Sequence, residues 1–192
     1  MIKIVTPAAG DVVTLSELKE HLHILNDLED DYLSALLAAG TSFAEEFLNR
    51  YLLETEVLEY YDCFYANIVE LMRAPVSELV SVKYLDTDGN EQTLDVDTDF
   101  WFDSISEPSR IQVIDSWPTT QTKRMNSVYI QYKTGYGTAA DVPMPIKHAI
   151  KLICGAMYEK REDSVMRVYT SYDLIASRNL LYPYRLNKYQ RV

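Results

Sequence analysis

Three histidines and two cysteines are the residues of this chain best suited to hold a metal ion or to attack a substrate. His21 and His23 are two positions apart, so on a helix their side chains point about 200° apart and cannot both face one metal. His148 has no Cys or His nearby in the sequence, and we interpret it as a surface or interface residue. Cys63 and Cys154 lie 91 positions apart, which is no metal-ligand spacing, and we interpret both as reduced, buried, small hydrophobic residues. The sequence therefore predicts no metal site.

The carboxylates and glycines also lack a catalytic pattern. Asp86, Asp88 and Asn90 have the alternation of a calcium loop, but glycine comes at the fourth position instead of the sixth and no glutamate comes at the twelfth, which favours a plain β turn. Gly135-Tyr136-Gly137 lacks the third glycine of a dinucleotide-binding fingerprint. Twenty-nine acidic residues form pairs by chance, and no local motif selects one pair for acid–base catalysis. We therefore expect no catalysed reaction and no cofactor.

Two helices are predicted near the N-terminus. Thr14 followed by Glu17 is a capping-box pattern and predicts a helix over about 15–24, with Leu15, Leu18, Leu22 and Leu25 as its apolar stripe. In the longer helix that follows, the apolar residues fall on one side at 100° per residue: Leu33, Leu36, Leu37, Gly40, Phe43, Ala44, Phe47, Leu48 and Tyr51. Away from that stripe lies a small-residue patch, which is either a subunit interface or a set of ordinary exposed alanines: Ala35, Ala38 and Ala39.

Short strands are predicted between about Glu54 and Lys133, where β-branched and aromatic residues occur in short runs separated by Asp, Gly, Pro and Ser. The alternating stretch 80–84 and the Asp88-Gly89 turn predict a hairpin that continues into 91–94. Further strands are expected over 110–114 and 128–132. We expect the strands to be arranged sequentially and mostly antiparallel.

A third helix is predicted to begin at Pro143 and Pro145. Proline has no N–H, and it is tolerated in the first turn because the N–H groups there have no partner within the helix. Its inner face should carry Ile146, Ala149, Ile150, Ile153 and Met157. The opposite side carries residues that would let another backbone approach closely: Leu152, Gly155 and Ala156. This helix therefore has one face for the core and one that another backbone could approach.

The predicted fold class is α+β. Two N-terminal helices and the third helix after Pro143 form a helical frame, into which a small, mostly antiparallel β region is inserted, and an extended C-terminal tail follows. The expected parts are an N-terminal helical part over 1–51, the β region over 52–141, the third helix over 142–162 and a partner-docking tail over 163–192. No segment approaches the roughly 20 apolar residues that span a bilayer, so no membrane partner is expected.

Charge is uneven along the chain. The whole chain carries −11, but residues 161–192 carry +3, which leaves −14 on residues 1–160. The acidic body disfavours tight gripping of phosphate backbones, because that affinity comes from Lys and Arg. The C-terminal segment also holds five of the fifteen tyrosines, and Tyr with Arg is a pairing enriched at protein interfaces.

Two stretches carry a resemblance to a known family. The first runs from Val13 to Leu22 and continues through Asp30, Asp31, Leu33, Leu36, Leu37 and Ala39. The second joins 128–132 through 135–137 and Val142-Pro143 to 146–150 and ends in 158–162, with Pro108, Arg110-Ile111 and Trp117-Pro118 between the two stretches. In order and spacing, this combination resembles the head-to-tail connector (adaptor, or head-completion) proteins of tailed bacteriophages and gene-transfer particles, over roughly residues 12 to 162.

The resemblance implies a structural virion protein. Such proteins form a ring, usually dodecameric, below the portal vertex, and packaged DNA passes through its centre without sequence-specific binding. It implies four partners: further copies of the chain, the portal protein, a stopper or tail-completion protein, and the passing DNA. It places the protein in the virion neck, after synthesis in the bacterial host cytoplasm.

The C-terminal segment commonly reaches the portal in that family. From about Ser164 onward this chain matches no motif, so the roles of its residues there are our hypothesis. We expect docking on the portal, or on a neighbour's acidic body, through Arg178, Tyr182, Tyr184, Arg185, Lys188, Tyr189 and Arg191. Deletion after about Ser177 should then abolish portal binding and leave the fold intact.

Three alternatives stay open. The chain could be a stopper or tail-completion protein of the same neck, which differs in whether it binds the portal directly. A virion-associated carboxylate-based hydrolase would need a deep pocket with two convergent carboxyl groups of shifted pKa. A saccharide-binding module would need Trp101, Trp117 and tyrosines exposed together in one groove.

Overall fold

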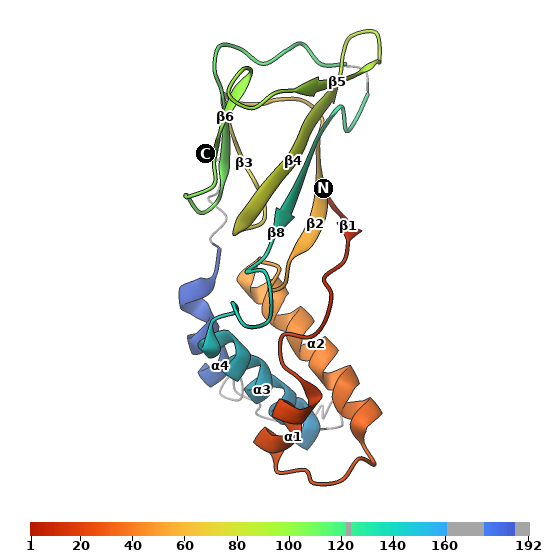
Figure 1. Cartoon of the computed structure of the whole chain (residues 1–192), viewed down its shortest axis with the longest axis vertical. Helices are drawn as coiled ribbons and strands as arrows, with labels where there is room; N and C mark the ends of the chain where they lie inside the picture. The colour runs from red at the N-terminus through yellow and green to blue at the C-terminus, as the bar shows by residue number, and fades with distance from the viewer. Residues whose placement is uncertain (122–123, 161–174, 187–192) are drawn as a thin grey trace, which may run out of the picture. The chain divides into compact units, whose positions relative to one another are not determined.

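The chain divides into two compact units in the computed structural model (Figure 1), which describes residues 1–121, 124–160 and 175–186. The strand unit comprises Met1–Ala9 and Leu53–Gly137. The helical unit comprises Gly10–Leu52 and the described part of Thr138–Asn187. We had assigned residues 1–51 to the helical part, and this is wrong for residues 1–9. They form the strand β1 (Ile2–Thr6), which pairs antiparallel with β2 (Thr55–Tyr61) of the strand unit.

The helical unit contains the predicted helices and one more. Its elements are α1 (Leu15–Leu22), α2 (Asp30–Leu48), α3 (Met144–Glu159), α4 (Ile175–Leu181) and the 3₁₀ turn η1 (Tyr182–Tyr184). The capping box is confirmed: Glu17 N–H donates to Thr14 Oγ1 at 3.2 Å, and Thr14 N–H donates to Glu17 Oε2 at 2.7 Å. None of the helices in the described ranges is long and apolar enough to cross a membrane.

The helix α1 ends two residues earlier than expected. His23 adopts a left-handed conformation with φ of 58°, and its N–H donates to the carbonyl of Glu20. This turn redirects the chain, so Leu25 leaves the apolar stripe to which we had assigned it and is 99% exposed.

The core of the helical unit lies between α2 and α3, which run side by side (Figure 1). Leu33, Leu37, Ala44 and Leu48 of α2 are buried. Of the predicted inner residues of α3, Ile146, Ala149, Ile150 and Ile153 are buried and Met157 is half-buried. Gly40 leaves room for a side chain of α3, because a Cβ built there would lie 2.7 Å from Cys154 Sγ. The third helix therefore buries the face that the sequence predicted.

The described part of the C-terminal tail is helical, which corrects our expectation of an extended segment. Helix α4 packs against α3 and buries Ser177 and Leu181, which are four positions apart on one face. Beyond η1, Leu186 is buried and its N–H donates to the Leu48 carbonyl at 2.9 Å. Two buried residues are too few to produce a recognisable helical period, so the sequence did not predict this helix.

The described residues of the strand unit form two antiparallel sheets. The five-stranded sheet has the order β1-β2-β8-β4-β5, and the three-stranded sheet has the order β3-β7-β6. Besides β1 and β2, the strands are β3 (Ile68–Glu70), β4 (Val76–Leu85), β5 (Glu91–Leu94), β6 (Phe100–Asp103), β7 (Arg110–Val113) and β8 (Val128–Thr134). The expected antiparallel pairing is confirmed, but the expected sequential order is wrong. β8 lies between β2 and β4 because its seven residues pair with both, and its alternate residues Val128, Ile130 and Tyr132 are buried.

The predicted hairpin of 80–94 is confirmed as β4 and β5. Asp86 forms its turn: Asp86 Oδ1 accepts hydrogen bonds from the N–H groups of Asp88 and Asn90, and Gly89 has φ of +89°. The resemblance to a calcium loop is therefore a β turn, as expected. Val80 is exposed rather than alternating inward, because the register shifts between Leu79 and Ser81.

Candidate functional site

The outer face of α2 carries the predicted small-residue patch. Ala35, Ala38 and Ala39 are exposed, while Leu33, Leu36 and Leu37 point into the core. The separation follows from the helical period, which places the two sets on opposite sides. The patch is therefore available on the surface of the subunit, and its contact with a neighbouring copy stays a prediction.

The corresponding residues of α3 are less accessible. Leu152, Gly155 and Ala156 are all half-buried. A Cβ built on Gly155 would lie 3.4 Å from Leu22 Cδ2, so α1 covers part of the face that we expected a neighbour to approach. The subunit-interface role of these three residues stays a prediction, and the surface left for it is smaller than that on α2.

The segment of α4 and η1 carries four of the residues expected to dock on the portal. Arg178, Tyr182 and Arg185 are exposed, and Tyr182 is 66% accessible. Tyr184 is half-buried, and its carbonyl accepts a hydrogen bond from Arg50 Nε at 2.6 Å. The Arg185 guanidinium lies 5.2 Å from the ring centroid of Phe47, a cation–π contact. This segment is thus fixed to the C-terminal end of α2.

Three further residues of the docking hypothesis, Lys188, Tyr189 and Arg191, lie outside the described residues. Leu181 and Leu186 are buried, and this affects the test of portal binding by deletion after about Ser177. Removing everything after Ser177 would strip two side chains from the core of the helical unit. Our expectation that this deletion leaves the fold intact is therefore wrong, and the cut belongs after Leu186.

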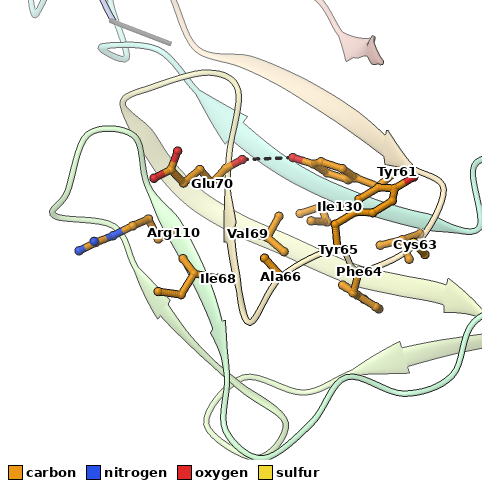
Figure 2. Close-up of a pocket in the computed structure, with 11 residues that line it drawn as sticks. Tyr61, Cys63, Phe64, Tyr65, Ala66, Ile68, Val69, Glu70, Arg110 and Ile130 are labelled. Carbon is orange, nitrogen blue, oxygen red and sulfur yellow. Dashed lines mark hydrogen bonds between the residues drawn. The ribbon is translucent and has the colours of Figure 1, made fainter. Parts of the chain in front are cut away.

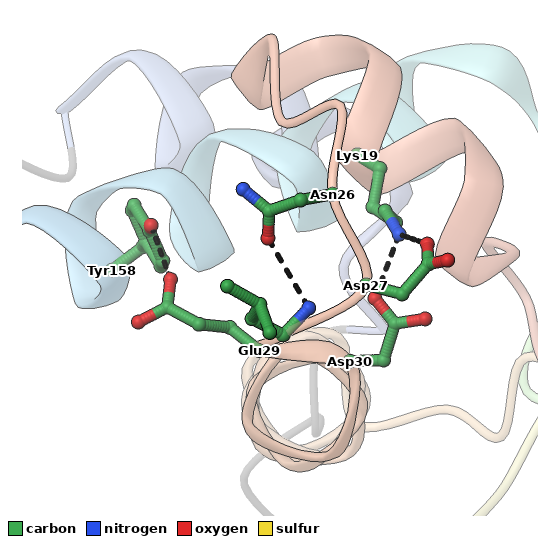
Figure 3. Close-up of polar contacts among 7 residues, drawn as sticks. Lys19, Asn26, Asp27, Glu29, Asp30 and Tyr158 are labelled. Carbon is green, nitrogen blue, oxygen red and sulfur yellow. Dashed lines mark hydrogen bonds and ion pairs between the residues drawn. The ribbon is translucent and has the colours of Figure 1, made fainter.

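A surface that we did not anticipate lies in the loop between α1 and α2. Leu25 is 99% exposed and Leu28 is 90% exposed. Lys19 Nζ bonds to Asp27 Oδ1 at 2.5 Å and to Asp30 Oδ1 at 2.7 Å, across the loop (Figure 3). These hydrogen bonds raise the pKa of Lys19, and the bond from Lys19 lowers the pKa of Asp27. The two leucines on either side of Asn26 and Asp27 were the sequence signal for this surface.

The strand unit contains a pocket of about 440 Å³ beside β3 and β8 (Figure 2). Tyr65 and Ile68 at its edge are 64% and 44% exposed, and the Tyr61 hydroxyl donates to the Glu70 carbonyl at 3.2 Å. Among the described lining residues Glu70 supplies the one acidic side chain. The pair of convergent carboxylates that the hydrolase alternative requires is absent from that lining.

Glu59, in the middle of β2, is a carboxylate that the fold buries completely. Glu59 Oε2 accepts hydrogen bonds from the Tyr132 hydroxyl at 2.8 Å and from Met72 N–H at 3.2 Å, while Oε1 accepts one from Tyr61. Burial raises the pKa of Glu59 despite these bonds. Because no solvent reaches it, the structure gives Glu59 a role in holding the strands together.

The two tryptophans do not share a groove. The ring of Trp117 stacks on Phe64 with centroids 4.1 Å apart and an interplanar angle of 5°, and Trp117 Nε1 donates to the Ala66 carbonyl at 2.7 Å. Trp101 is 52% exposed and lies on β6. One face of Trp117 is therefore covered by its own chain, which does not favour the saccharide-binding alternative.

The histidines of α1 and α3 meet without forming a metal site. The rings of His21 and His148 lie 5.8 Å apart, edge to face. Burial, together with the charges of His148 and Lys151, lowers the pKa of His21. Within residues 1–121, 124–160 and 175–186, no three His, Cys, Asp or Glu side chains gather in a group that could hold a metal ion.

A family model matches the N-terminal part of the chain. The model described as phage gp6-like head-tail connector protein matches residues 12–101, which include α1, α2 and the strands β2 to β5. The resemblance to head-tail connectors is confirmed. The matched family is one of structural connectors rather than of enzymes. No curated protein matches the chain.

Solved structures share the fold along nearly the whole chain. A chain from the neck of an empty GTA particle with C6 symmetry is 20% identical, with a TM-score of 0.78, and the match covers 99% of this chain and 97% of that one. A chain from the virion of a native gene transfer agent particle is 19% identical with a TM-score of 0.79, and one from the neck of a native GTA particle with C12 symmetry is 19% identical with a TM-score of 0.72; both matches cover the same shares of the two chains. The α+β fold that the sequence predicted is thereby confirmed.

Proposed function

We propose that this chain is a structural subunit of a virion neck, that its copies form a ring below the portal, and that packaged DNA passes through the ring. The family match over residues 12–101 carries this proposal. The shared fold supports it, because the similar chains come from necks with C6 and C12 symmetry. The work of such a subunit is to bridge its neighbours, with no bond made or broken.

Ring closure has to overcome charge. Each copy carries −11, so twelve copies would carry −132 and would repel one another unless the interfaces offset the repulsion. Two features offset it in this proposal. The outer face of α2 allows close approach at Ala35, Ala38 and Ala39, with a smaller contribution from Leu152, Gly155 and Ala156 of α3. The basic C-terminal segment supplies the opposite charge.

The C-terminal segment docks on the portal or on the acidic body of a neighbouring subunit. Residues 175–186 contain two arginines and no acidic residue, and Arg178, Tyr182 and Arg185 are exposed. Exposed Tyr and Arg side chains on an anchored helix lose little conformational freedom when they bind. The proposed host compartment is the bacterial cytoplasm, where the subunit is made before it joins the particle.

The decisive experiment mixes the purified full-length chain with portal rings and images the particles by electron microscopy. We expect a second ring stacked on the portal. A chain truncated after Leu186 tests the last six residues, because Leu181 and Leu186 remain to complete the core. It should keep its helical circular dichroism and bind the portal more weakly.

The alternative of a stopper or tail-completion protein gives a different image. Such a protein would leave bare portals unoccupied and would bind only after another neck protein had been added. Failure of the full-length chain to bind the portal, with or without a second neck protein, would overturn the connector proposal.

A further inference from the structure

The strongest unexplained feature of the molecule is the pair of leucines in the loop between α1 and α2. Leu25 is 99% exposed and Leu28 is 90% exposed, and they are three positions apart. Single exposed apolar residues are common, but two nearly complete leucine side chains close together on one loop are a feature of contact surfaces. Their burial against a partner would remove most of their apolar area from water.

The loop that carries these leucines is fixed at several points (Figure 3). Lys19 of α1 reaches across to Asp27 and Asp30, and Asn26 Oδ1 accepts a hydrogen bond from Leu28 N–H at 3.1 Å. On the other side, the Tyr158 hydroxyl of α3 donates to Glu29 Oε2 at 2.6 Å. A surface held in place in this way loses little conformational entropy when a partner binds.

The surroundings of the leucines define the chemistry of the partner. Asp27 and Asp31 are exposed, and Glu29 and Asp30 are half-buried beside them. A partner must therefore offer an apolar surface bordered by positive charge. Within the described helical unit, the segment of α4 and η1 has this character: Tyr182 and Pro183 are exposed between Arg178 and Arg185, and no acidic residue lies in 175–186.

These two surfaces cannot meet within one subunit. The acidic leucine loop leads into the first turn of α2, whereas η1 is fixed to its last turn through Leu186 and Leu48. A helix of 19 residues is about 28 Å long. Two different surfaces on one subunit that fit each other form a heterologous contact, and repetition of such a contact gives a closed ring or an open filament.

We propose that Leu25 and Leu28 of one subunit pack on Tyr182 and Pro183 of the next, with Arg178 and Arg185 facing the carboxylates of the loop. This inference rests on the ring of the proposed function and names its subunit contact. It also requires α2 to lie along the circumference of the ring, so that its two ends reach two different neighbours. The residues after Leu186 are left to meet the portal.

Cross-linking tests this contact directly. Two single-site proteins, Leu28→Cys and Tyr182→Cys, are prepared with Cys63→Ser in both, because Cys63 is the partly accessible native cysteine and Cys154 is buried. They are mixed, assembled on portal rings and treated with a short bismaleimide. We expect dimers that contain one copy of each protein, and a control pair with Ile105→Cys in place of Leu28→Cys should give none.

The outcomes separate the two proposals. Rings that form without the mixed dimer would overturn the contact and leave the connector function standing. A wild-type chain that forms no ring would overturn the function and the contact with it.

A second set of variants measures the contribution of each side. Leu25→Ser with Leu28→Ser should reduce the yield of rings at least about tenfold, whereas Ile105→Ser, which changes a side chain of the strand unit that is 93% exposed, should not. Asp31→Arg and Arg178→Glu should each weaken assembly, and the combined variant should recover it. Normal rings from the leucine variant, coupled with loss of binding to another neck protein, would assign the loop to that protein and overturn the contact.

Discussion

The two units of this subunit achieve a fixed structure by different means. The helical unit buries an apolar core and, among its described residues, two polar side chains, Arg50 and Ser177. The described residues of the strand unit bury six polar side chains, including Glu59 and Thr134. The first depends chiefly on the matching of side-chain volumes, whereas the second depends on hydrogen bonds and close backbone contacts.

This difference has a functional sense for a bridging subunit. The apolar core of the helical unit leaves its outer faces free to carry the small residues, leucines and arginines that we propose for contacts with neighbouring copies. The buried hydrogen bonds of the strand unit tie β2, β8 and the segment before β4 together through one carboxylate. Substitutions that obstruct the backbone or break these bonds should therefore damage the strand unit most, whereas a change of volume in the helical unit should be correctable.

Gly135→Ala should have the largest effect. A Cβ at Gly135 would lie 2.3 Å from the Leu53 carbonyl oxygen, and the backbone there has φ of +122°. Because the obstacle is backbone, no side-chain movement relieves it, and we expect a loss of more than about 4 kcal/mol in the free energy of unfolding. Tryptophan fluorescence during urea unfolding reports on this unit, because Trp101 and Trp117 both belong to it.

Gly89→Ala is the matched control for Gly135→Ala. Its backbone also has positive φ, +89°, but the nearest atom to an added Cβ is Gln121 Nε2 at 4.0 Å. It should cost only the conformational penalty of about 1 to 2 kcal/mol. Equal losses for the two variants would mean that the contact with Leu53 contributes nothing.

Glu59→Ala should have the next largest effect. It leaves the Tyr132 hydroxyl and the Met72 N–H without their acceptor, and it leaves the Tyr61 hydroxyl with the Glu70 carbonyl alone. Buried donors without a partner cost about 1 to 3 kcal/mol each, and with partial relaxation we expect a total loss of about 3 kcal/mol. An unchanged urea midpoint in the tryptophan signal would show that the network is dispensable.

Glu59 should also give the strand unit a distinctive pH dependence. The raised pKa means that the folded state holds the proton more tightly than the unfolded chain, whose ordinary value is 4.5. The stabilisation is fully present below that value and is lost as the pH rises through the raised pKa. Subtracting the profile of Glu59→Gln from that of the wild type isolates this fall, and a flat difference would contradict the assignment.

Elements with local signals were predictable from the sequence. The capping box at Thr14 and Glu17 and the turn at Gly89 depend on residues within a few positions, so their positions followed directly. The order of the strands did not follow, because β8 pairs with β2 across more than 60 residues of sequence. The burial of Glu59 could not be predicted from the sequence. Leu58 and Tyr60 on the half-buried face of β2 are as apolar as Val57 and Tyr61 on the buried face, so the alternation does not show which face is inside.

The candidate surfaces were predictable to a similar degree. The helical period placed Ala35 and Ala38 on the outside of α2. It placed Leu25 on the inside of α1, because nothing in the sequence indicated that His23 would take a left-handed conformation and end the helix. A single backbone conformation thus turned a predicted core residue into the most exposed leucine of the described chain.

Gly40→Ala should have a smaller effect than Gly135→Ala and Glu59→Ala, and a second substitution should correct it. The added Cβ would lie 2.7 Å from Cys154 Sγ, and the next nearest atoms are at 3.7 Å. We expect a loss of about 1 to 2 kcal/mol, the usual cost of overpacking less the higher helix propensity of Ala. In a Cys154→Ala background the obstacle is gone, so the same substitution should be neutral or stabilising by up to about 1 kcal/mol. Helical circular dichroism at 222 nm during urea unfolding measures the four proteins of this cycle. The contact at Gly135 is with backbone, whereas the contact at Gly40 is with the Cys154 side chain. If Gly40→Ala and Cys154→Ala showed no coupling energy, the Gly40 obstacle would not be the Cys154 side chain, and the proposed difference between the two units would be lost.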